Sequence, residues 1–268
     1  MNKIFYILLI ALTLGSCSSY QKALKSEDVA VKNDVATKMY EAGKYTKAIR
    51  LFEQIAPSYR GKAGAEKMFY LFAQSYYKTN QHLLAGYQFD SFTSSYPKSE
   101  KVEEAAYLAA ESYSKLSPRY SLDQVDTQKA IDKLQNFINT YPNSEYLPQA
   151  NVIVKDLREK LEKKAYEIAK QYHTTGEWSR DYGAAIKALD NFIADYPGTP
   201  FKEKALYYKF DAAYLLAINS IESKKQERLN AAKSAHAALV KFNASTEYKE
   251  DADKKLATLD KELQQFSN

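Results

Sequence analysis

A short phrase built around Tyr-Pro occurs three times in this chain of 268 residues. It reads FTSSYPKSEKVEEA at 92–105, FINTYPNSEYLPQA at 137–150 and FIADYPGTPFKEKA at 192–205. Proline cannot donate a backbone N–H, and it moves the residue before it out of helical geometry. We therefore predict that a helix ends at the tyrosine of each phrase, at Tyr96, Tyr141 and Tyr196.

The residues after each proline predict the start of the next helix. Two positions on stand Ser99, Ser144 and Thr199, and hydroxyl side chains are preferred helix N-caps. The next residue in each case is Glu or Pro, types that the first helical turn favours. Each phrase is thus expected to form a helix end, a tight corner and a helix start.

Constant spacings before each proline indicate how the helices pack. Small residues stand twelve positions before the prolines, at Ala85, Ala130 and Ala185, and aromatic residues stand five positions before them, at Phe92, Phe137 and Phe192. A small and a large residue at constant offsets on one helix predict a close helix crossing beside a filled gap. A helical protein with chance Tyr-Pro turns does not account for this regularity.

The helices upstream carry a matching pattern, a small residue three positions before an aromatic residue or Met. It occurs at Ala36 and Met39, in AQSYYK (73–78), in AAESYSK (109–115) and at Ala169 and Tyr172. Paired helices with this pattern resemble tetratricopeptide repeats. We therefore predict an all-α tetratricopeptide-repeat solenoid of about five helix pairs, at 29–60, 65–97, 103–142, 164–197 and 203–243, with Asn243 where the fifth proline would fall.

One repeat domain is expected over 29–268. The chain has only 8 Gly and 7 Pro, and no Gly- or Ser-rich linker interrupts it. At its end, 247–266 places Leu256, Leu259, Leu263 and Phe266 at helical spacing. This segment is predicted to form a capping helix that covers the open end of the stack.

The N-terminus has the features of a lipoprotein signal peptide. Lys3 is followed by an apolar run over 4–14, which is too short to span a bilayer because a span needs about 20 residues. The run ends in LGSC, which resembles a lipobox, so Cys17, the only cysteine, is expected to be acylated. Residues 1–16 then form the signal peptide and 17–28 a lipid-anchored linker; the alternative is a conventional secretory signal with an incidental cysteine.

The residues after Cys17 predict the membrane. Ser18 and Ser19 follow it, and the first acidic residue is Glu27. An Asp directly after the cysteine commonly retains a lipoprotein at the inner membrane, and an acidic cluster can export it to the cell surface. Since neither signal is present, we expect a lipid anchor at the periplasmic face of the outer membrane.

Several stretches resemble the BamD family of outer-membrane assembly lipoproteins, also called ComL/YfiO. They are YPNSEYLPQANVIVKDLREKLEKKAYEIAKQYHTTGEW at 141–178, FIADYPGTP at 192–200 and LFAQSYYKTNQHLLAGYQFDSFTSSYPKS at 71–99. The resemblance implies a subunit of the β-barrel assembly complex. It also implies binding to the periplasmic domains of a central, BamA-like barrel subunit through the C-terminal repeats, to other assembly lipoproteins, and to unfolded outer-membrane clients. The chain departs from the pattern at APSYRGKAG (56–64) and in the missing fifth proline.

A concave groove lined by the first helix of each pair suits an extended client strand with unpaired backbone groups and aromatic side chains. Its inward-facing positions, projected from the repeat register, are Asn33, Thr37, Tyr40, Tyr70, Gln74, Tyr77, Tyr107 and Glu111. This lining is rich in tyrosine and nearly neutral, and it lacks the basic set with which chaperone-tail repeats grip a terminal carboxylate. The chain has 23 Tyr, so packing between repeats is the alternative role for each one.

Other functional classes find little support. The net charge is +5 with both signs interspersed, which indicates a solvated surface rather than a nucleic-acid site. We find no metal-ligand spacing, phosphate loop or nucleophile motif, and therefore expect no enzyme, metal or cofactor. Two alternatives stay open: a SusD-like lipoprotein that binds a glycan or peptide for uptake, and a scaffold for another envelope complex.

Overall fold

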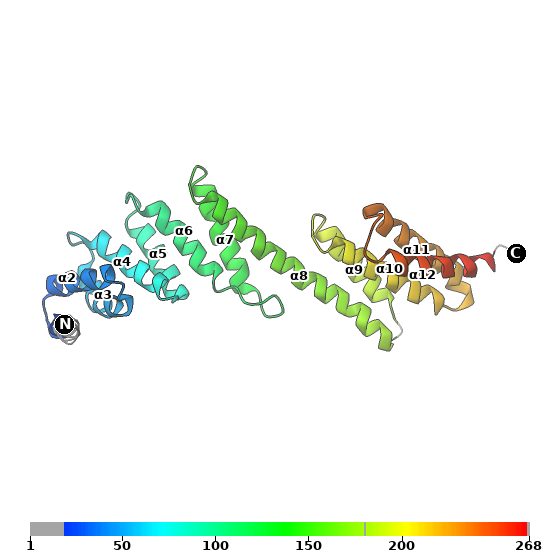
Figure 1. Cartoon of the computed structure of the whole chain (residues 1–268), viewed down its shortest axis with the longest axis horizontal. Helices are drawn as coiled ribbons and strands as arrows, with labels where there is room; N and C mark the ends of the chain where they lie inside the picture. Colours follow the sequence, from blue (N-terminus) through cyan, green and yellow to red (C-terminus); the bar gives the residue numbers. More distant parts are fainter. Residues whose placement is uncertain (1–18, 180, 267–268) are drawn as a thin grey trace, which may run out of the picture. The chain divides into compact units, whose positions relative to one another are not determined.

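A computed structural model describes residues 19–179 and 181–266 of the chain (Figure 1). Every regular element within these ranges is helical, which confirms the all-α fold class. The predicted signal peptide (1–16) and the acylation site Cys17 lie outside the described residues. Residues 19–25, which we expected to belong to the linker, are helical.

The helix bounds reproduce four of the five predicted pairs and the final cap, whereas the fourth pair, predicted at 164–197, begins at Leu147 because α8 is longer than expected. The pairs are α2 (Val29–Glu41) with α3 (Tyr45–Tyr59), α4 (Ala65–Lys78) with α5 (His82–Ser95), α6 (Val102–Ser114) with α7 (Val125–Thr140), α8 (Leu147–Ser179) with α9 (Gly183–Asp195), and α10 (Lys202–Ile218) with α11 (Glu222–Phe242). The cap is α12 (Lys249–Gln264). The long α8 lies in the region of strongest family resemblance.

The chain divides into two compact units. Unit 1 comprises the chain up to Pro118 together with Asp123–Leu157, and unit 2 comprises Arg119–Leu122 together with the chain from Arg158 onward. Helix α8 contributes residues to both units.

In unit 1 each helix from α2 to α7 packs on the next, and α4 also packs on α2. The small residues predicted at the crossings are buried, with Ala85 and Ala130 both at 0% exposure. Phe92 and Phe137 fill the adjacent space and are also buried. The constant offsets in the sequence therefore correspond to close contacts between helices.

In unit 2, α12 covers the last helix pair. It packs on both α10 and α11. Leu259 on α12 joins a buried core with Phe210 and Leu239, and Leu263 and Phe266 pack against that core. The predicted capping helix is therefore confirmed.

The Tyr-Pro corners end the helices as predicted, but the predicted N-caps are wrong: Lys101 and Phe201 stand at the N-cap positions of α6 and α10, with no side-chain capping hydrogen bond. Helices α5, α7 and α9 end directly before the tyrosines. The Ser99 hydroxyl accepts a hydrogen bond from the Lys101 N–H at 3.0 Å, which closes a turn just before the helix. The next helix begins three residues after this hydroxyl, because the Ser99 carbonyl first closes a tight turn with the Val102 N–H at 3.1 Å.

The fifth corner has the same geometry without proline. Asn243 caps the end of α11 and occupies the place of the tyrosine, so Ala244, not Asn243, stands where proline occurs in the other corners. Its Oδ1 accepts a hydrogen bond from the Ser245 N–H at 3.0 Å. The Thr246 hydroxyl then accepts from the Tyr248 N–H at 3.3 Å, as Ser99 does in its own corner.

The repeat pattern predicts the wrong packed residue at one position in α8. The pattern pairs Ala169 with Tyr172, but Tyr172 is 47% exposed. The neighbouring His173 is buried instead, and its Nε2 lies 2.6 Å from Asp211 Oδ2 on α10. At this point of α8, the side chain that faces α10 is therefore His173 and not Tyr172.

Candidate functional site

The predicted groove positions all lie in unit 1, on α2, α4 and α6. These are the first helices of the first three pairs. Because α2 and α4 pack directly on each other, their predicted positions adjoin in space.

Asn33 and Thr37 on α2 line a pocket of about 260 Å³ together with Tyr59, Lys67 and Met68. The side-chain oxygen of Asn33, Oδ1, is buried and has no hydrogen-bond partner. A buried polar atom without a partner costs free energy, and native structures rarely leave one unpaired. Asn33 therefore lines the pocket with a side chain whose buried acceptor is unsatisfied within the protein.

Tyr70 on α4 lines a second pocket, of about 500 Å³, with Leu71, Phe92 and Lys101. Gly64 and Lys67 line both pockets, so the two adjoin. We call the joined pockets the N-terminal groove, defined by Asn33, Thr37, Lys67, Tyr70 and Lys101.

The Tyr70 ring is held from several sides. Its ring centroid lies 5.5 Å from that of Phe92. Its hydroxyl accepts a hydrogen bond from Gln74 Nε2 at 2.8 Å, and Gln74 itself is buried. The Lys101 Nζ lies 5.7 Å from the ring centroid, within cation–π range.

The remaining predicted positions make contacts of their own. Tyr77 donates a hydrogen bond from its hydroxyl to Glu111 Oε2 at 2.8 Å, which links α4 to α6. The buried Tyr107 stacks on Tyr146, with ring centroids 4.7 Å apart. Tyr40 meets Tyr45 edge to face at 5.3 Å. These contacts give the tyrosines a packing role, and a role for them in binding a ligand stays a prediction.

The tyrosine hydroxyls of the groove stay protonated at neutral pH. Burial, aided by a hydrogen bond with Glu104, raises the pKa of Tyr70. Burial and the hydrogen bond to Glu111 likewise raise the pKa of Tyr77. Burial raises the pKa of Tyr107 to about 12. Each hydroxyl therefore keeps its proton, which Tyr77 already donates to Glu111.

Sequence reasoning missed the two lysines of the groove. Lys67 and Lys101 line the joined pockets, where Glu66 and Asp34 balance their charge and keep the lining nearly neutral. Lys101 is also paired, since its Nζ lies 2.9 Å from Glu104 Oε2. Lys67 lies on α4 but is not one of the predicted inward-facing positions, and Lys101 stands in the corner before α6. Lys101 is two residues after Ser99, and that spacing could have drawn attention to it.

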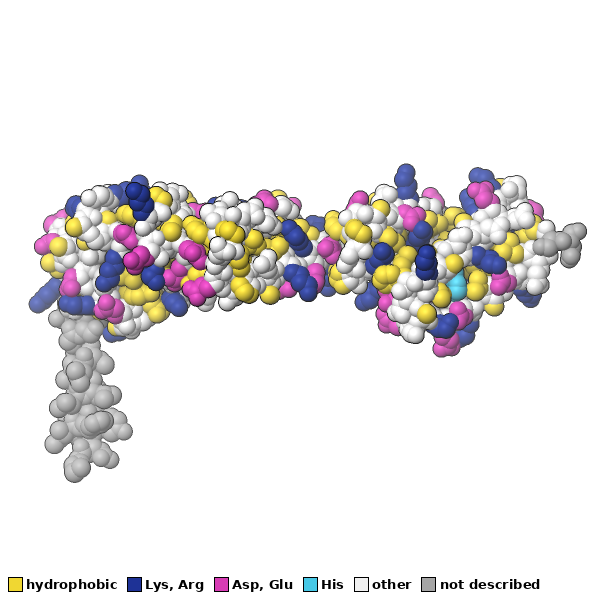
Figure 2. All heavy atoms as spheres, turned by 90° about the horizontal axis from the view of Figure 1, so that it is seen from above, with side chains coloured by type: hydrophobic (Ala, Val, Ile, Leu, Met, Phe, Trp, Pro, Cys, Tyr) yellow, Lys and Arg dark blue, Asp and Glu magenta, His cyan; other side chains and the backbone are white. Residues whose placement is uncertain are grey.

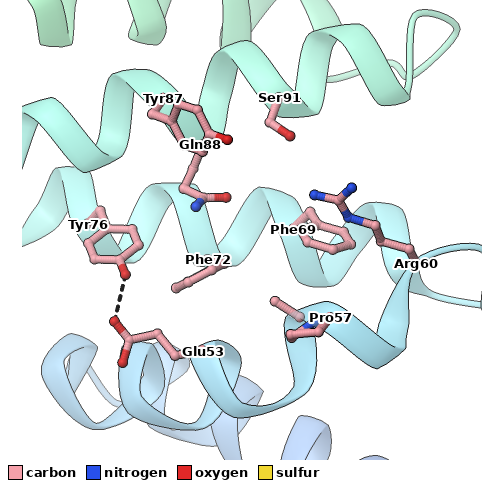
Figure 3. A pocket seen from close by; sticks show the side chains of 10 residues that line it. Glu53, Pro57, Arg60, Phe69, Phe72, Tyr76, Tyr87, Gln88 and Ser91 are labelled. Carbon is pink, nitrogen blue, oxygen red and sulfur yellow. Dashed lines mark hydrogen bonds between the residues drawn. The ribbon is translucent and has the colours of Figure 1, made fainter.

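A further pocket, of about 530 Å³, lies among α3, α4 and α5 (Figure 3). Its aromatic side chains are Phe69, Phe72, Tyr76 and Tyr87. The Tyr76 hydroxyl donates to Glu53 Oε1 at 2.7 Å, at the end of the pocket away from Arg60 (Figure 3). No sequence pattern predicted this pocket, because its walls come from three helices with no shared motif.

Within residues 19–179 and 181–266, no cluster of three or more His, Cys, Asp or Glu side chains could hold a metal ion. Over the same ranges, no helix is both long and apolar enough to cross a membrane.

The sequence matches the YfiO family, described as outer membrane lipoprotein, over residues 33–180 and 178–266. These two matches cover most of the chain, including both units. The chain belongs to the YfiO family. Its membership confirms the family expected from the sequence and associates the protein with the outer membrane.

Solved tetratricopeptide-like repeats are also similar to this YfiO-family chain. One structure contains the nearly identical TPR-like repeats assigned to a putative kinesin light chain of Podosopora anserina; it is 14% identical, covers 82% of this chain and 100% of its own, and has a TM-score of 0.32. A structure of a substituted form of those repeats is 15% identical, covers 78% of this chain and 95% of its own, and has a TM-score of 0.32.

Proposed function

We propose that this protein is a lipoprotein subunit of the outer-membrane β-barrel assembly complex. In that role it scaffolds the central, BamA-like barrel subunit and recognises unfolded outer-membrane clients. Acyl chains on Cys17 hold it at the periplasmic face of the outer membrane. Membership of the YfiO family and the N-terminal groove support this proposal.

The observation that carries the client-binding role is the N-terminal groove, whose wall includes Asn33, a residue with a buried and unpartnered Oδ1 that a turn of the side chain would present to a client. An unfolded client strand has unpaired backbone N–H groups, and one of them can donate to this oxygen. The face of Tyr70 can take an aromatic side chain of the same strand. The groove thus provides both main-chain and side-chain recognition.

The scaffolding role is tested by isolating partners. We would capture the tagged, acylated protein from envelopes in mild detergent and identify its partners by mass spectrometry. We expect a near-stoichiometric outer-membrane barrel protein with periplasmic repeat domains. Recovery of a transporter barrel with glycan-degrading neighbours would contradict the proposal and favour the uptake function.

The client-binding role is tested with Asn33→Ala. Asn33 Oδ1 makes no hydrogen bond within the protein, so its removal costs the fold no hydrogen bond. It removes one acceptor for the client, worth about 1 kcal/mol or roughly a fivefold loss of affinity. The probe is a labelled synthetic peptide with alternating aromatic residues, and its binding is followed by fluorescence anisotropy.

The matched control is Asn191→Ala on α9, an exposed position outside the groove. We expect it to leave peptide affinity unchanged, and both variants to keep the wild-type circular dichroism spectrum and melting temperature. The double variant Tyr70→Ala with Tyr77→Ala is expected to weaken binding further. If folded Asn33→Ala bound the peptide with wild-type affinity, this result would contradict client binding in the N-terminal groove. It would not affect the proposed scaffolding role.

A further inference from the structure

The chain directly after the proposed acylation site is attached to the first repeat. Residues 19–25 are helical, and within them Tyr20 and Ala23 are buried, at 4% and 0% exposure. The Nζ of Lys47 on α3 lies 5.1 Å from the centroid of the Tyr20 ring. This short helix therefore belongs to the folded first repeat rather than to a free tether.

The distance from Cys17 to this helix is short. Only Ser18 separates Cys17 from Ser19, the first described residue. Two residues span at most about 7 Å of chain. If acyl chains on Cys17 lie in the bilayer, as the proposed function requires, residues 19–25 stand at the level of the lipid headgroups.

Basic side chains occupy this end of the molecule. Lys22 and Lys25 are exposed on the short helix, and Arg50 is exposed on α3, three residues from Lys47. None of Lys22, Lys25 and Arg50 has an ion pair or hydrogen bond among the described residues. Figure 2 shows Lys and Arg side chains exposed at the N-terminal end, at the left of the view, with Asp and Glu side chains among them.

The acidic residues nearby do not cancel this charge. Between Ser19 and Val31 the acidic residues are Glu27 and Asp28. Asp28 caps α2, where its Oδ1 accepts from the Ala30 N–H at 2.8 Å. Asp28 keeps its negative charge in this bond, so Glu27 and Asp28 together offset two of the four basic charges of Lys22, Lys25, Lys47 and Arg50.

We infer that Lys22, Lys25, Lys47 and Arg50 form a surface that binds anionic phospholipid headgroups beside the lipid anchor. We call it the anchor-side basic surface. Electrostatic attraction to a charged membrane falls off within a Debye length, about 8 Å at physiological salt, and the short connection to Cys17 keeps the short helix within that range. The surface thereby orients the first repeat, and the groove beside it, against the membrane. This inference rests on the acylation of Cys17 in the proposed function.

The test uses the mature chain from residue 17 with Cys17→Ser, so that binding reports on the protein surface alone. The probes are vesicles of phosphatidylcholine with and without one quarter phosphatidylglycerol, and bound protein is measured by flotation. We expect binding to the anionic vesicles, weakened in about 0.5 M salt, where screening is stronger, and little binding to the neutral ones. Each basic residue near a charged membrane contributes about a fivefold gain in affinity, so Lys22→Glu, Lys25→Glu and Arg50→Glu together should reduce binding at least tenfold.

The matched control reverses three exposed lysines elsewhere, Lys98→Glu, Lys224→Glu and Lys241→Glu, with the same change in net charge. We expect this variant to keep most of its vesicle binding. Equal loss in both triple variants, or no binding to anionic vesicles, overturns the inference. Normal vesicle binding by the first triple variant, with loss of protein partners from the envelope pull-down, would assign the surface to a protein instead.

The two proposals fail in distinguishable ways. Intact-mass measurement of the wild-type protein reports the acylation of Cys17 directly. An unacylated Cys17 would remove the anchor from the proposed function and, with it, the reason why this surface faces the membrane. An acylated Cys17 with unchanged vesicle binding by the first triple variant would overturn the anchor-side basic surface alone.

Discussion

Asp211 is a buried carboxylate on α10, and a histidine and a lysine hold it in place. One oxygen lies 2.6 Å from His173 Nε2 on α8, and the other lies 2.6 Å from Lys255 Nζ on α12. Lys255 also reaches Asp251 at 2.6 Å. A buried charge is tolerated only when it is paired and hydrogen-bonded, so this cluster ties three helices of unit 2 together.

The ion cluster predicts an acid-sensitive contribution to stability. Burial by itself raises the pKa of Asp211, but hydrogen bonds from His173 and Lys255 outweigh it and lower the pKa below its ordinary value. A lowered pKa in the folded state stabilises the protein above the unfolded pKa, about 3.9, and this stability is lost as pH falls through the folded pKa.

We therefore expect Asp211→Asn to lower the free energy of unfolding by about 3 kcal/mol at pH 7, and by clearly less below about pH 4. Urea denaturation at both pH values measures the difference. The control Asp190→Asn breaks the more exposed ion pair with Lys209 and should cost less than about 1 kcal/mol. If the free energies of unfolding of wild type and Asp211→Asn differed by the same amount at both pH values, the predicted link between Asp211 ionisation and stability would be wrong.

At the scale of helices, more than one residue type can end a helix at a corner. Three corners use proline, whereas the fifth uses the Asn243 side chain, which accepts from the Ser245 N–H. Asn243 Nδ2 also donates to Glu203 Oε1 at 3.1 Å, just as Ser99 in the second corner donates to Glu66 Oε1 at 2.5 Å. Both bonds return to the first turn of the first helix of the same pair, so the corner closes the repeat.

The packing of α8 on the start of α9 predicts the effect of adding one methyl group. A Cβ at Gly176 would lie 2.7 Å from Cδ1 of Tyr182, whose ring is buried. Overpacking of this kind costs about 1–3 kcal/mol, partly offset by about 1 kcal/mol of better helix propensity. We expect Gly176→Ala to lower the melting temperature of the protein.

The control is Gly198→Ala in the Tyr196–Thr199 corner, where an added Cβ would meet no atom within 4 Å. Differential scanning fluorimetry on both variants should show a lower melting temperature for Gly176→Ala alone. Equal melting temperatures for Gly176→Ala and wild type would show that Tyr182 moves aside without cost.

At the scale of the whole molecule, a repeat stack exposes its core wherever it ends, so the last helix has to cover it. In unit 2 that helix is α12, whose Ala252 and Leu259 are fully buried against the core of α10 and α11. The opposite side of α12 carries charged pairs such as Lys254 with Glu250, at 2.6 Å. Because α12 is apolar on one side and charged on the other, the repeat stack ends in a polar surface.

Removal of residues 247–268 should therefore uncover the leucines that α12 covers, including Leu229 and Leu239. We expect faster amide hydrogen exchange throughout α10 and α11, because stability in a repeat stack comes from each neighbour. Helices α4–α6 of unit 1 serve as the internal reference, since α12 packs only on α10 and α11 among its principal contacts. Unchanged protection of α10 and α11 would show that α12 is not needed as a cap.

The sequence by itself determined the helical class, the pairs and their corners. Those features depend on proline geometry, on hydroxyl side chains that close the turns, and on constant offsets such as Ala85 and Phe92, which act between neighbours along the chain. It also carried the signal-peptide pattern and the resemblance to the YfiO family. Each of these signals is local, so it is readable before the chain folds.

Only the tertiary structure decided which side chains face which partner. It buried His173 and exposed Tyr172, brought Lys67 and Lys101 beside Tyr70, and left Asn33 Oδ1 without a partner. Residues from α2, α4 and the corner before α6 line the groove. Its shape therefore cannot be predicted from any single stretch of sequence. Side-chain burial depends on the helix packed opposite, and a repeat pattern specifies that helix only on average.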